Sequence, residues 1–167
     1  MQDDEVRRQP FRRLDLTDND LILDYATGNP TSSVEAMVSA GFNFGDWLGK
    51  RITSSVAAAP SSNGNYALGV ANNALLVNPF GNGTTTGPLF DGQSVDSTAV
   101  LVKFTQRVDL DLDGLVTGND AAIFNGAFSE GDSGATWQTG DVDYDGVYSS
   151  NDAAIFNSFY DESLGAL

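Results

Sequence analysis

Hydrophobic and polar positions alternate over residues 98–106, where Val100, Val102 and Phe104 fall on one face. This period of two, in a segment rich in β-branched residues, predicts a strand. Leucines alternate in the same way on both sides of the turn signal TDND within residues 14–25, which predicts a β-hairpin. Residues 66–77 predict a hairpin, or a strand, a turn and a strand, and the Gly- and Thr-rich residues 78–93 predict a long surface loop.

Other segments have the three- and four-residue spacing of helices. Residues 32–40 predict a helix that begins with a capping box of Ser32 and Glu35 and ends at Gly41. A second short helix is predicted over residues 52–59, before Pro60. Two later segments predict helices whose apolar stripes pack against each other. These stripes are Ile123, Phe124, Ala127 and Phe128 in one helix, and Ile155, Phe156, Phe159 and Tyr160 in the other.

Each of the two later helices follows a copy of the same acidic segment. DLDLDGLVTGND at residues 109–120 and DVDYDGVYSSND at residues 141–152 match through the AAIFN that follows both, with a period of 32 residues. The two segments are therefore a duplication.

Both copies have the residue types of a twelve-residue calcium loop, with carboxylates at positions 1, 3 and 5, glycine at 6, a hydroxyl at 9 and an acid at 12. Calcium takes about six to eight oxygen ligands, and alternate residues of a tight loop can direct them toward one centre. Aspartate and glycine clusters also form turns without metal, but two complete copies favour the calcium interpretation. We therefore predict two bound Ca²⁺ ions. The predicted ligands are Asp109, Asp111, Asp113, Leu115, Thr117 and Asp120 in the first loop and Asp141, Asp143, Asp145, Val147, Ser149 and Asp152 in the second, with Leu115 and Val147 acting through backbone carbonyls.

Neither loop is preceded by a predicted helix, so each unit is a loop followed by a helix, or half an EF-hand. Two such units, each closed by Asp, resemble the dockerin repeats of cellulosome components over residues 106–162. The resemblance implies calcium-dependent folding and docking onto a cohesin domain through loop positions 10 and 11. Those positions hold Gly118, Asn119, Ser150 and Asn151, and the helices carry AAIFN in place of the Lys and Arg common in cellulosomal repeats. With LDLTDNDL at residues 14–21, the chain also looks similar to C-terminal regions of large bacterial secreted or surface proteins.

These elements predict an α+β fold. We expect an N-terminal arm over residues 1–13 and a small β-rich domain with short helices over residues 14–105. A dockerin-like tandem calcium-binding domain of two half EF-hand units is expected over residues 106–167.

Composition narrows the classes of function. The chain has no cysteine and no histidine, so the usual general base, thiol nucleophile and zinc ligands are missing, and we expect no enzyme. A net charge of −15 argues against binding to nucleic acid. No apolar stretch is long enough to enter a membrane, and the expected location is extracellular or on the cell surface.

The expected function is a structural calcium-binding module that mediates protein–protein assembly in a surface layer, fibre or filament. Arg7, Arg8, Arg12 and Arg13 are four of the chain's eight basic residues, so the arm is either a frayed end or a segment that docks on the acidic body of a neighbouring molecule. One alternative is a dockerin-type module that anchors a larger protein to a cohesin-like partner. Another is binding of a glycan by Trp47, Trp137 or the tyrosines.

Overall fold

The computed structural model describes residues 13–81, 88–127 and 132–165. The predicted arm, apart from Arg13, lies outside these ranges, as do Phe128 and residues 82–87 of the predicted surface loop.

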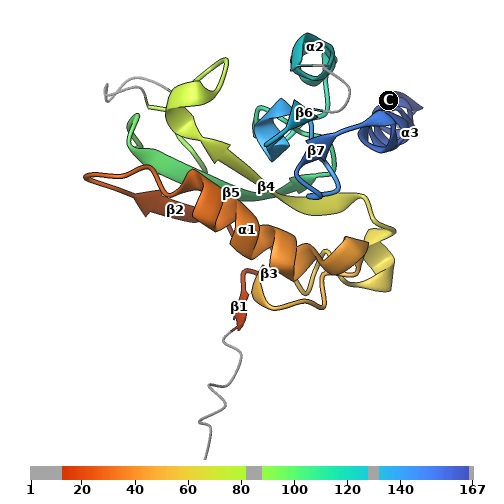
Figure 1. Ribbon diagram of the computed structural model, residues 1–167, viewed down its shortest axis with the longest axis horizontal. Coiled ribbons are helices and arrows are strands. Elements are labelled where there is room, and N and C mark those ends of the chain that lie inside the picture. The colour runs from red at the N-terminus through yellow and green to blue at the C-terminus, as the bar shows by residue number, and fades with distance from the viewer. Residues whose placement is uncertain (1–12, 82–87, 128–131, 166–167) are drawn as a thin grey trace, which may run out of the picture.

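A three-stranded antiparallel sheet occupies the middle of the molecule (Figure 1). Strand β5, Ala99–Gln106, lies between β2, Leu21–Asp24, and β4, Tyr66–Asn72. The β4–β5 pairing runs from Tyr66 opposite Gln106 to Asn72 opposite Val100. Val100, Leu101 and Val102 are completely buried, so the strand predicted over residues 98–106 is confirmed as the centre of the sheet.

The hairpin predicted over residues 14–25 is wrong. Strand β1, Arg13–Asp15, pairs in parallel with β3, Arg51–Thr53, whereas β2 pairs with β5. The carboxylate of Asp15 accepts hydrogen bonds from the backbone N–H groups of Thr17, at 3.1 Å, and of Ser55, at 2.8 Å. These bonds direct the chain away from β1 and into a different sheet.

The helix predicted over residues 52–59 is also wrong, because its first residues form β3. Ile52 and Thr53 are β-branched and buried against their neighbours, which favours a strand. The Ser54 hydroxyl then accepts a hydrogen bond from Ala57 N–H at 2.9 Å and holds a turn.

Helix α1, Thr31–Phe42, confirms the predicted helix, but its ends differ from those expected. The Asn29 carboxamide oxygen accepts hydrogen bonds from Thr31, and no side chain caps the helix at Pro30. Gly41 lies inside the helix at its closest approach to β3, where a Cβ would lie only 1.6 Å from Ile52 O. Close packing, rather than termination of the helix, therefore requires this glycine.

The segment after β4 is a short 3₁₀ helix, η3, Asn73–Leu75, so residues 66–77 contain one strand and no hairpin. Three further 3₁₀ helices are η1, Asn43–Gly45; η2, Pro60–Ser62; and η4, Trp137–Thr139. Two short strands, β6, Asp132–Ser133, and β7, Val147–Tyr148, form an antiparallel pair.

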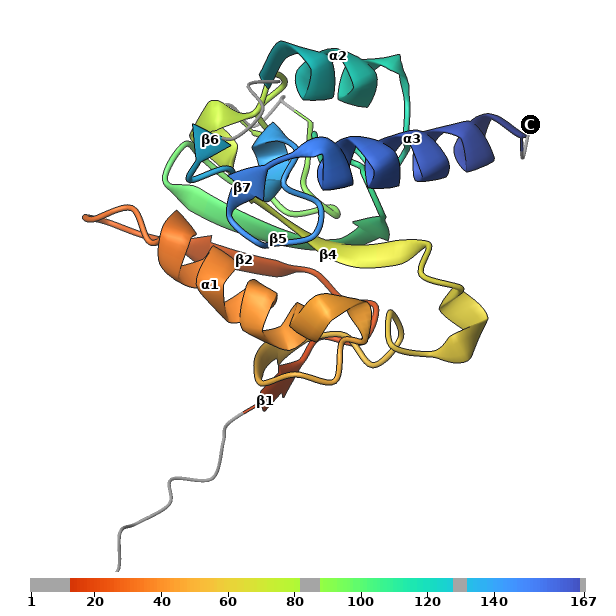
Figure 2. The same ribbon diagram turned by 45° about the vertical axis from the view of Figure 1, so that its right-hand side comes forward.

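Helices α2, Gly118–Ala127, and α3, Ser150–Gly165, follow the two acidic segments as predicted. Their apolar stripes do meet, since the Phe124 and Phe156 rings stack with centroids 4.2 Å apart. In Figure 2, α1 lies on one side of the sheet and α2 and α3 lie on the other. Over the residues that the structure describes, the protein has an α+β fold with mixed sheets and three α-helices.

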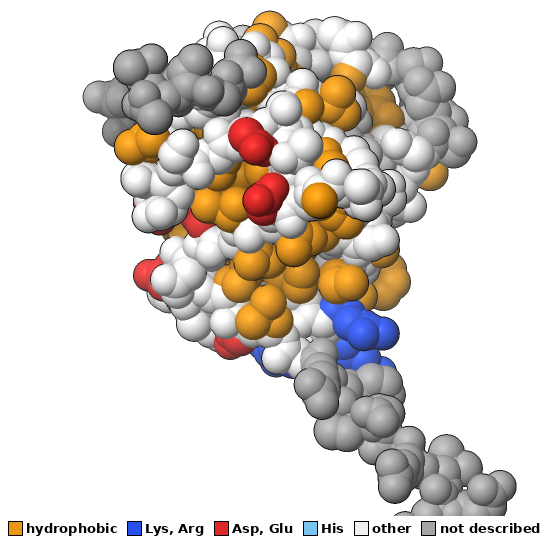
Figure 3. Space-filling model, turned by 90° about the vertical axis from the view of Figure 1, so that its left-hand side faces the viewer, with side chains coloured by type: hydrophobic (Ala, Val, Ile, Leu, Met, Phe, Trp, Pro, Cys, Tyr) orange, Lys and Arg blue, Asp and Glu red, His pale blue; other side chains and the backbone are white. Residues whose placement is uncertain are grey.

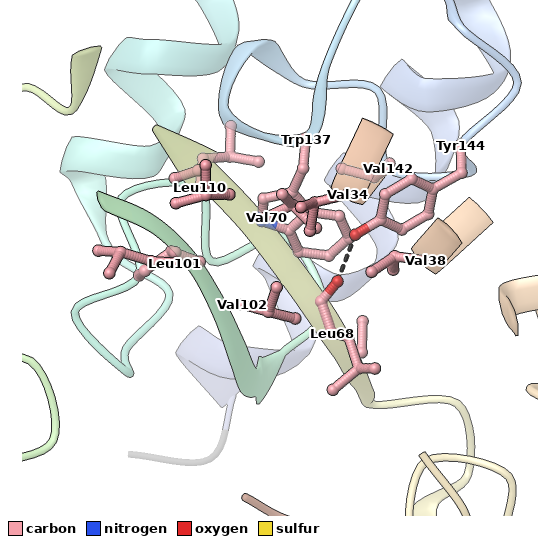
Figure 4. Packing of buried hydrophobic residues seen from close by; sticks show 14 of the residues in the cluster. Val34, Val38, Leu68, Val70, Leu101, Val102, Leu110, Trp137, Val142 and Tyr144 are labelled. Carbon is pink, nitrogen blue, oxygen red and sulfur yellow. Dashed lines mark hydrogen bonds between the residues drawn. The ribbon is translucent and has the colours of Figure 1, made fainter. Parts of the chain in front are cut away.

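The hydrophobic core contains residues from both sides of the domain boundary predicted at residue 105. Figure 4 shows Trp137 and Tyr144 from the C-terminal segment packed beside Val38 of α1 and Leu68 of β4. The boundary itself stays a prediction. Across the described ranges, no helix combines the length and hydropathy needed to cross a membrane.

Basic side chains gather at one end of the molecule (Figure 3). At this end β1 pairs with β3, and Arg13 lies directly opposite Arg51. The two acidic segments lie elsewhere in the fold, although Asp15 belongs to the same strand as Arg13.

Candidate metal centres

The first acidic segment is a tight loop built around Asp109, which is completely buried. Its Oδ2 accepts hydrogen bonds from Gly114 N–H, at 2.9 Å, and from the Thr105 hydroxyl. Gly114 has a φ of +93°, which favours glycine at loop position 6 as predicted. The other oxygen of Asp109, Oδ1, is buried and has no hydrogen-bond partner within the described part of the chain.

Asp120 closes the first loop and lies in the first turn of helix α2. Its Oδ1 accepts from Leu110 N–H at 2.7 Å, and its Oδ2 accepts from Thr117 N–H at the same distance. The Thr117 hydroxyl accepts in turn from Asn119 N–H at 3.1 Å. Loop positions 9 and 12 therefore cap the helix that follows, a role that the Thr-x-x-Asp spacing signals but that the sequence analysis did not assign.

The second loop repeats the main hydrogen bonds of the first. Asp141 Oδ2 accepts from Gly146 N–H at 2.9 Å. Asp152 accepts from Val142 N–H at 3.0 Å and from Ser149 N–H at 2.9 Å, while Ser149 accepts from Asn151 N–H at 3.1 Å. The duplication seen in the sequence is therefore a duplication of loop structure.

Position 4 of each loop has an unusual backbone conformation. Leu112 has a φ of 60° and Tyr144 a φ of 59°, values that non-glycine residues rarely adopt. Both side chains are buried, and the Tyr144 hydroxyl donates a hydrogen bond to Leu68 O of β4. This conformation places a large side chain under each loop and attaches the loop to the sheet.

Two groups of aspartates come close enough to hold a metal ion, with one oxygen per residue lying within 4.8 Å of the others. The first group is Asp109, Asp111 and Asp120, and the second is Asp141, Asp143 and Asp145.

The remaining predicted ligands lie around these two groups. The carboxylate of Asp113 is exposed and accepts from Leu115 N–H at 2.8 Å, and Asp152 is buried as a cap of α3. The Leu115 side chain is exposed and Val147 lies in β7, so neither side chain takes part. Their backbone carbonyls stay predicted ligands.

Electrostatics oppose full ionisation of these groups when no cation is present. Burial, followed by the nearby charges of Asp120 and Asp111, raises the pKa of Asp109 to about 7. Burial and the same neighbour, Asp120, raise the pKa of Asp111 to about 6. Burial also raises the pKa of Asp141 to about 7. A bound cation would offset this repulsion, so the donor set and the unpaired Asp109 Oδ1 both fit a metal ion.

Trp137 connects the two loops. Its indole N–H donates to Asp109 O in the first loop at 2.8 Å, and its ring stacks on Tyr144 of the second with centroids 5.5 Å apart. Its backbone N–H donates to Glu35 of α1 at 2.8 Å. No local sequence pattern predicts this role, because the three contacts come from distant parts of the chain.

Neither tryptophan offers a ring face to a sugar, because Trp47 is 2% exposed and Trp137 is completely buried.

Comparisons with protein-family models, with curated proteins and with solved structures found no match to this chain.

Proposed function

We propose that the two loops bind two Ca²⁺ ions and that calcium stabilises a non-enzymatic extracellular module that mediates protein–protein assembly. One observation carries the metal part of this proposal. The same loop geometry occurs twice, and in the first copy it buries an aspartate oxygen, Asp109 Oδ1, for which the described residues supply no donor.

The donor chemistry favours calcium over other metals. Each loop offers aspartate carboxylates, and hard oxygen donors suit Ca²⁺ and Mg²⁺. Because the chain contains no cysteine or histidine, it lacks the usual ligands of zinc and copper. Mg²⁺ requires near-octahedral geometry and retains several waters, whereas Ca²⁺ accepts the larger, less regular ligand set of a twelve-residue loop. Two half EF-hand units are therefore our interpretation of the loop–helix pairs.

A structural role follows from the way the loops join the core. Leu112 and Tyr144 are loop residues and core residues at once, so an ion that fixes either loop also fixes the packing against β4. Calcium at about a hundred times its dissociation constant would add about 2.7 kcal/mol of stability per site. This is a large part of the margin of an ordinary domain.

A second candidate is the dockerin-type module that binds a cohesin-like partner. The observation in its favour is that loop positions 10 and 11 are exposed in both copies, where the start of each helix meets solvent. These residues are Gly118, Asn119, Ser150 and Asn151. A soluble 1:1 complex lost on enlarging Ser150 and Asn151 would favour this candidate over self-assembly.

The metal part of the proposal is tested by calorimetric titration with calcium and by thermal unfolding in calcium and in chelator. We expect two bound ions and a rise in Tm of about 10 °C or more, with a smaller rise in magnesium. Asp109→Asn and Asp141→Asn should each remove about one site. Asp91→Asn is the matched control, because Asp91 is exposed and asparagine tolerates its φ of 45°. This variant should bind calcium as the wild type does. Unfolding that is unaffected by calcium would refute the proposal.

The assembly part is tested by light scattering after size exclusion, in calcium and after chelation. Regular assemblies that form in calcium and dissolve on chelation are the expected result. A compact monomer under both conditions would leave the metal proposal intact and refute self-assembly.

A further inference from the structure

A cavity of about 540 Å³ lies between the C-terminal end of α1 and the second loop. Phe42 and Phe44 line it from the α1 side, Asp143 and Asp145 from the loop, and Ile155 from α3. We call this space the α1–loop cavity. Its walls combine aromatic rings and carboxylates, which is the chemistry that holds cations flanked by apolar groups.

Phe44 stands at this cavity fully exposed to solvent. Its backbone has a φ of 60° and a ψ of 25°, a conformation that is costly for an aromatic residue. The turn that holds it is fixed on both sides, since Asn43 Nδ2 donates to Asp46 at 3.0 Å and Trp47 N–H donates to Phe42 O at 3.0 Å. A strained and fixed turn that exposes a large ring points to recognition, because exposed aromatic anchors dominate binding energy at interfaces.

The cavity already accommodates one guanidinium group. Arg107 lies over the Phe42 ring at 5.7 Å and over the Phe159 ring at 5.1 Å, beside Asp143. The second loop has four aspartates, at positions 1, 3, 5 and 12, so one bound Ca²⁺ leaves it with two negative charges in excess, and the Arg107 guanidinium in the cavity wall offsets one of them. The walls therefore retain a net attraction for further cations.

The chain itself contains a segment of matching chemistry. Residues 7–13 read RRQPFRR, in which Phe11 lies between two pairs of arginines and no residue is acidic. Residues 14–167 contain 20 acids and four basic residues. The twelve residues before Arg13 reach up to about 40 Å when extended. Arg13, the residue that follows this segment, lies in β1 at the basic end of the body, where β1 pairs with β3.

We propose that the α1–loop cavity binds residues 7–12 of a second copy of this chain. Phe11 enters beside Phe44, and the flanking arginines pair with Asp143 and Asp145 and stack on the aromatic walls. Because each copy has one segment and one cavity, it can give its segment to one neighbour and receive another, which makes a head-to-tail and open-ended contact. This inference rests on the assembly part of the proposed function and names the surface and the segment that produce it.

The test uses full-length variants in millimolar calcium. The arm variant carries Arg7→Glu, Arg8→Glu and Arg12→Glu. Because its segment is acidic, that segment should not enter the cavity of another copy. The cavity variant is Phe44→Asn, which relieves the backbone strain, since asparagine tolerates positive φ, and removes the ring. The matched control is Leu75→Asn, because Leu75 is 69% exposed on η3, away from the cavity lining. Thermal unfolding verifies that every variant folds.

The first measurement is fluorescence anisotropy of a labelled peptide of residues 1–13, titrated with the arm variant. We expect saturable binding that weakens with added salt. The affinity should fall about tenfold or more when Phe44→Asn is added to the arm variant. Adding Leu75→Asn instead should leave binding unchanged. Equal binding to all three proteins, or no binding to any of them, would overturn the proposal.

The second measurement is light scattering of mixtures. The arm variant and the cavity variant should each be monomeric alone and form a 1:1 complex when mixed, since one supplies the cavity and the other the segment. Absence of that complex would overturn the proposal. A second outcome would also overturn it: a wild type that stays monomeric and does not bind the peptide, while the arm variant does bind it. That result would mean that the segment occupies the cavity of its own copy. Wild-type assemblies in calcium that no variant disturbs would overturn the docking surface while leaving the proposed function intact.

Discussion

Glu35 of α1 allows a quantitative test of how a buried charge limits the stability of this fold. Its carboxylate accepts the backbone N–H of Trp137 at 2.8 Å, and burial raises its pKa from 4.5 to about 7. A carboxyl pKa that is higher in the folded state than in the unfolded state means that ionisation opposes folding. The penalty is absent below about pH 4.5, grows through the window up to about pH 7 and is constant above it.

Glu35→Gln removes this penalty and keeps an oxygen that can accept the Trp137 N–H bond. At about 1.4 kcal/mol per pKa unit, the shift corresponds to about 3 kcal/mol at most, and screening by solvent at a partly exposed group reduces this to about 1–2 kcal/mol. We therefore expect the variant to be more stable than the wild type by about 1–2 kcal/mol at pH 8. Most of the gain should disappear by pH 5, where the wild-type side chain is largely protonated in the folded state.

Urea unfolding in calcium, followed by tryptophan fluorescence at both pH values, measures this difference directly. Asp91→Asn is again the control, since it converts an exposed acid to an amide and should show no comparable gain. A gain of the same size at pH 5 and pH 8 would refute the electrostatic explanation. A loss at pH 8 would show that the carboxylate stabilises the fold through contacts that outweigh its burial.

Two further substitutions test the connection between the loops and the sheet. Trp137→Phe leaves Asp109 O without its indole donor inside the core. It should lower the free energy of unfolding in calcium by about 2–4 kcal/mol, measured with urea. A change below about 1 kcal/mol would contradict the bridging role. Gly69→Ala places a Cβ 2.6 Å from Leu112 Cδ2 and should lower both the Tm and the calcium affinity. Gly118→Ala is the control, because its Cβ meets nothing within 4 Å, and it should lower neither. Equal effects of the two substitutions would contradict the packing argument.

The acidic loops could be predicted from the sequence because their geometry is local. A twelve-residue loop with Asp at position 1 and Gly at position 6 positions its own hydrogen-bond partners, so Asp109 and Gly114 meet without help from distant residues. The same reasoning holds for the helices that follow, since Asp120 and Asp152 cap the helices within their own segments. Strand β5 was predictable for a related reason, because its own sequence is rich in β-branched residues.

The N-terminal half was predicted less well because its segments choose partners that are far away in sequence. Residues 14–25 have the pattern of a hairpin, yet each half pairs with a different strand, β3 or β5. Alternation shows that a segment is extended, but it does not identify the neighbouring strand. The capping box expected from Ser32 and Glu35 is also wrong, because the helix begins before Ser32 at Thr31 and the Glu35 carboxylate accepts the distant Trp137 N–H.

Strain at position 4 of each loop explains how an ion at the surface can act on the interior. A bulky residue at positive φ costs on the order of 1–3 kcal/mol, and Leu112 and Tyr144 both bear this cost. The burial of their side chains in the core compensates for it, and an ion that holds the loop oxygens together selects the same backbone conformation. Because Tyr144 also lines the α1–loop cavity, loss of calcium should relax the wall that the docking segment contacts. If the proposed function holds, calcium and assembly are coupled through the backbone of one loop, and peptide binding should weaken on chelation even where the sheet stays folded.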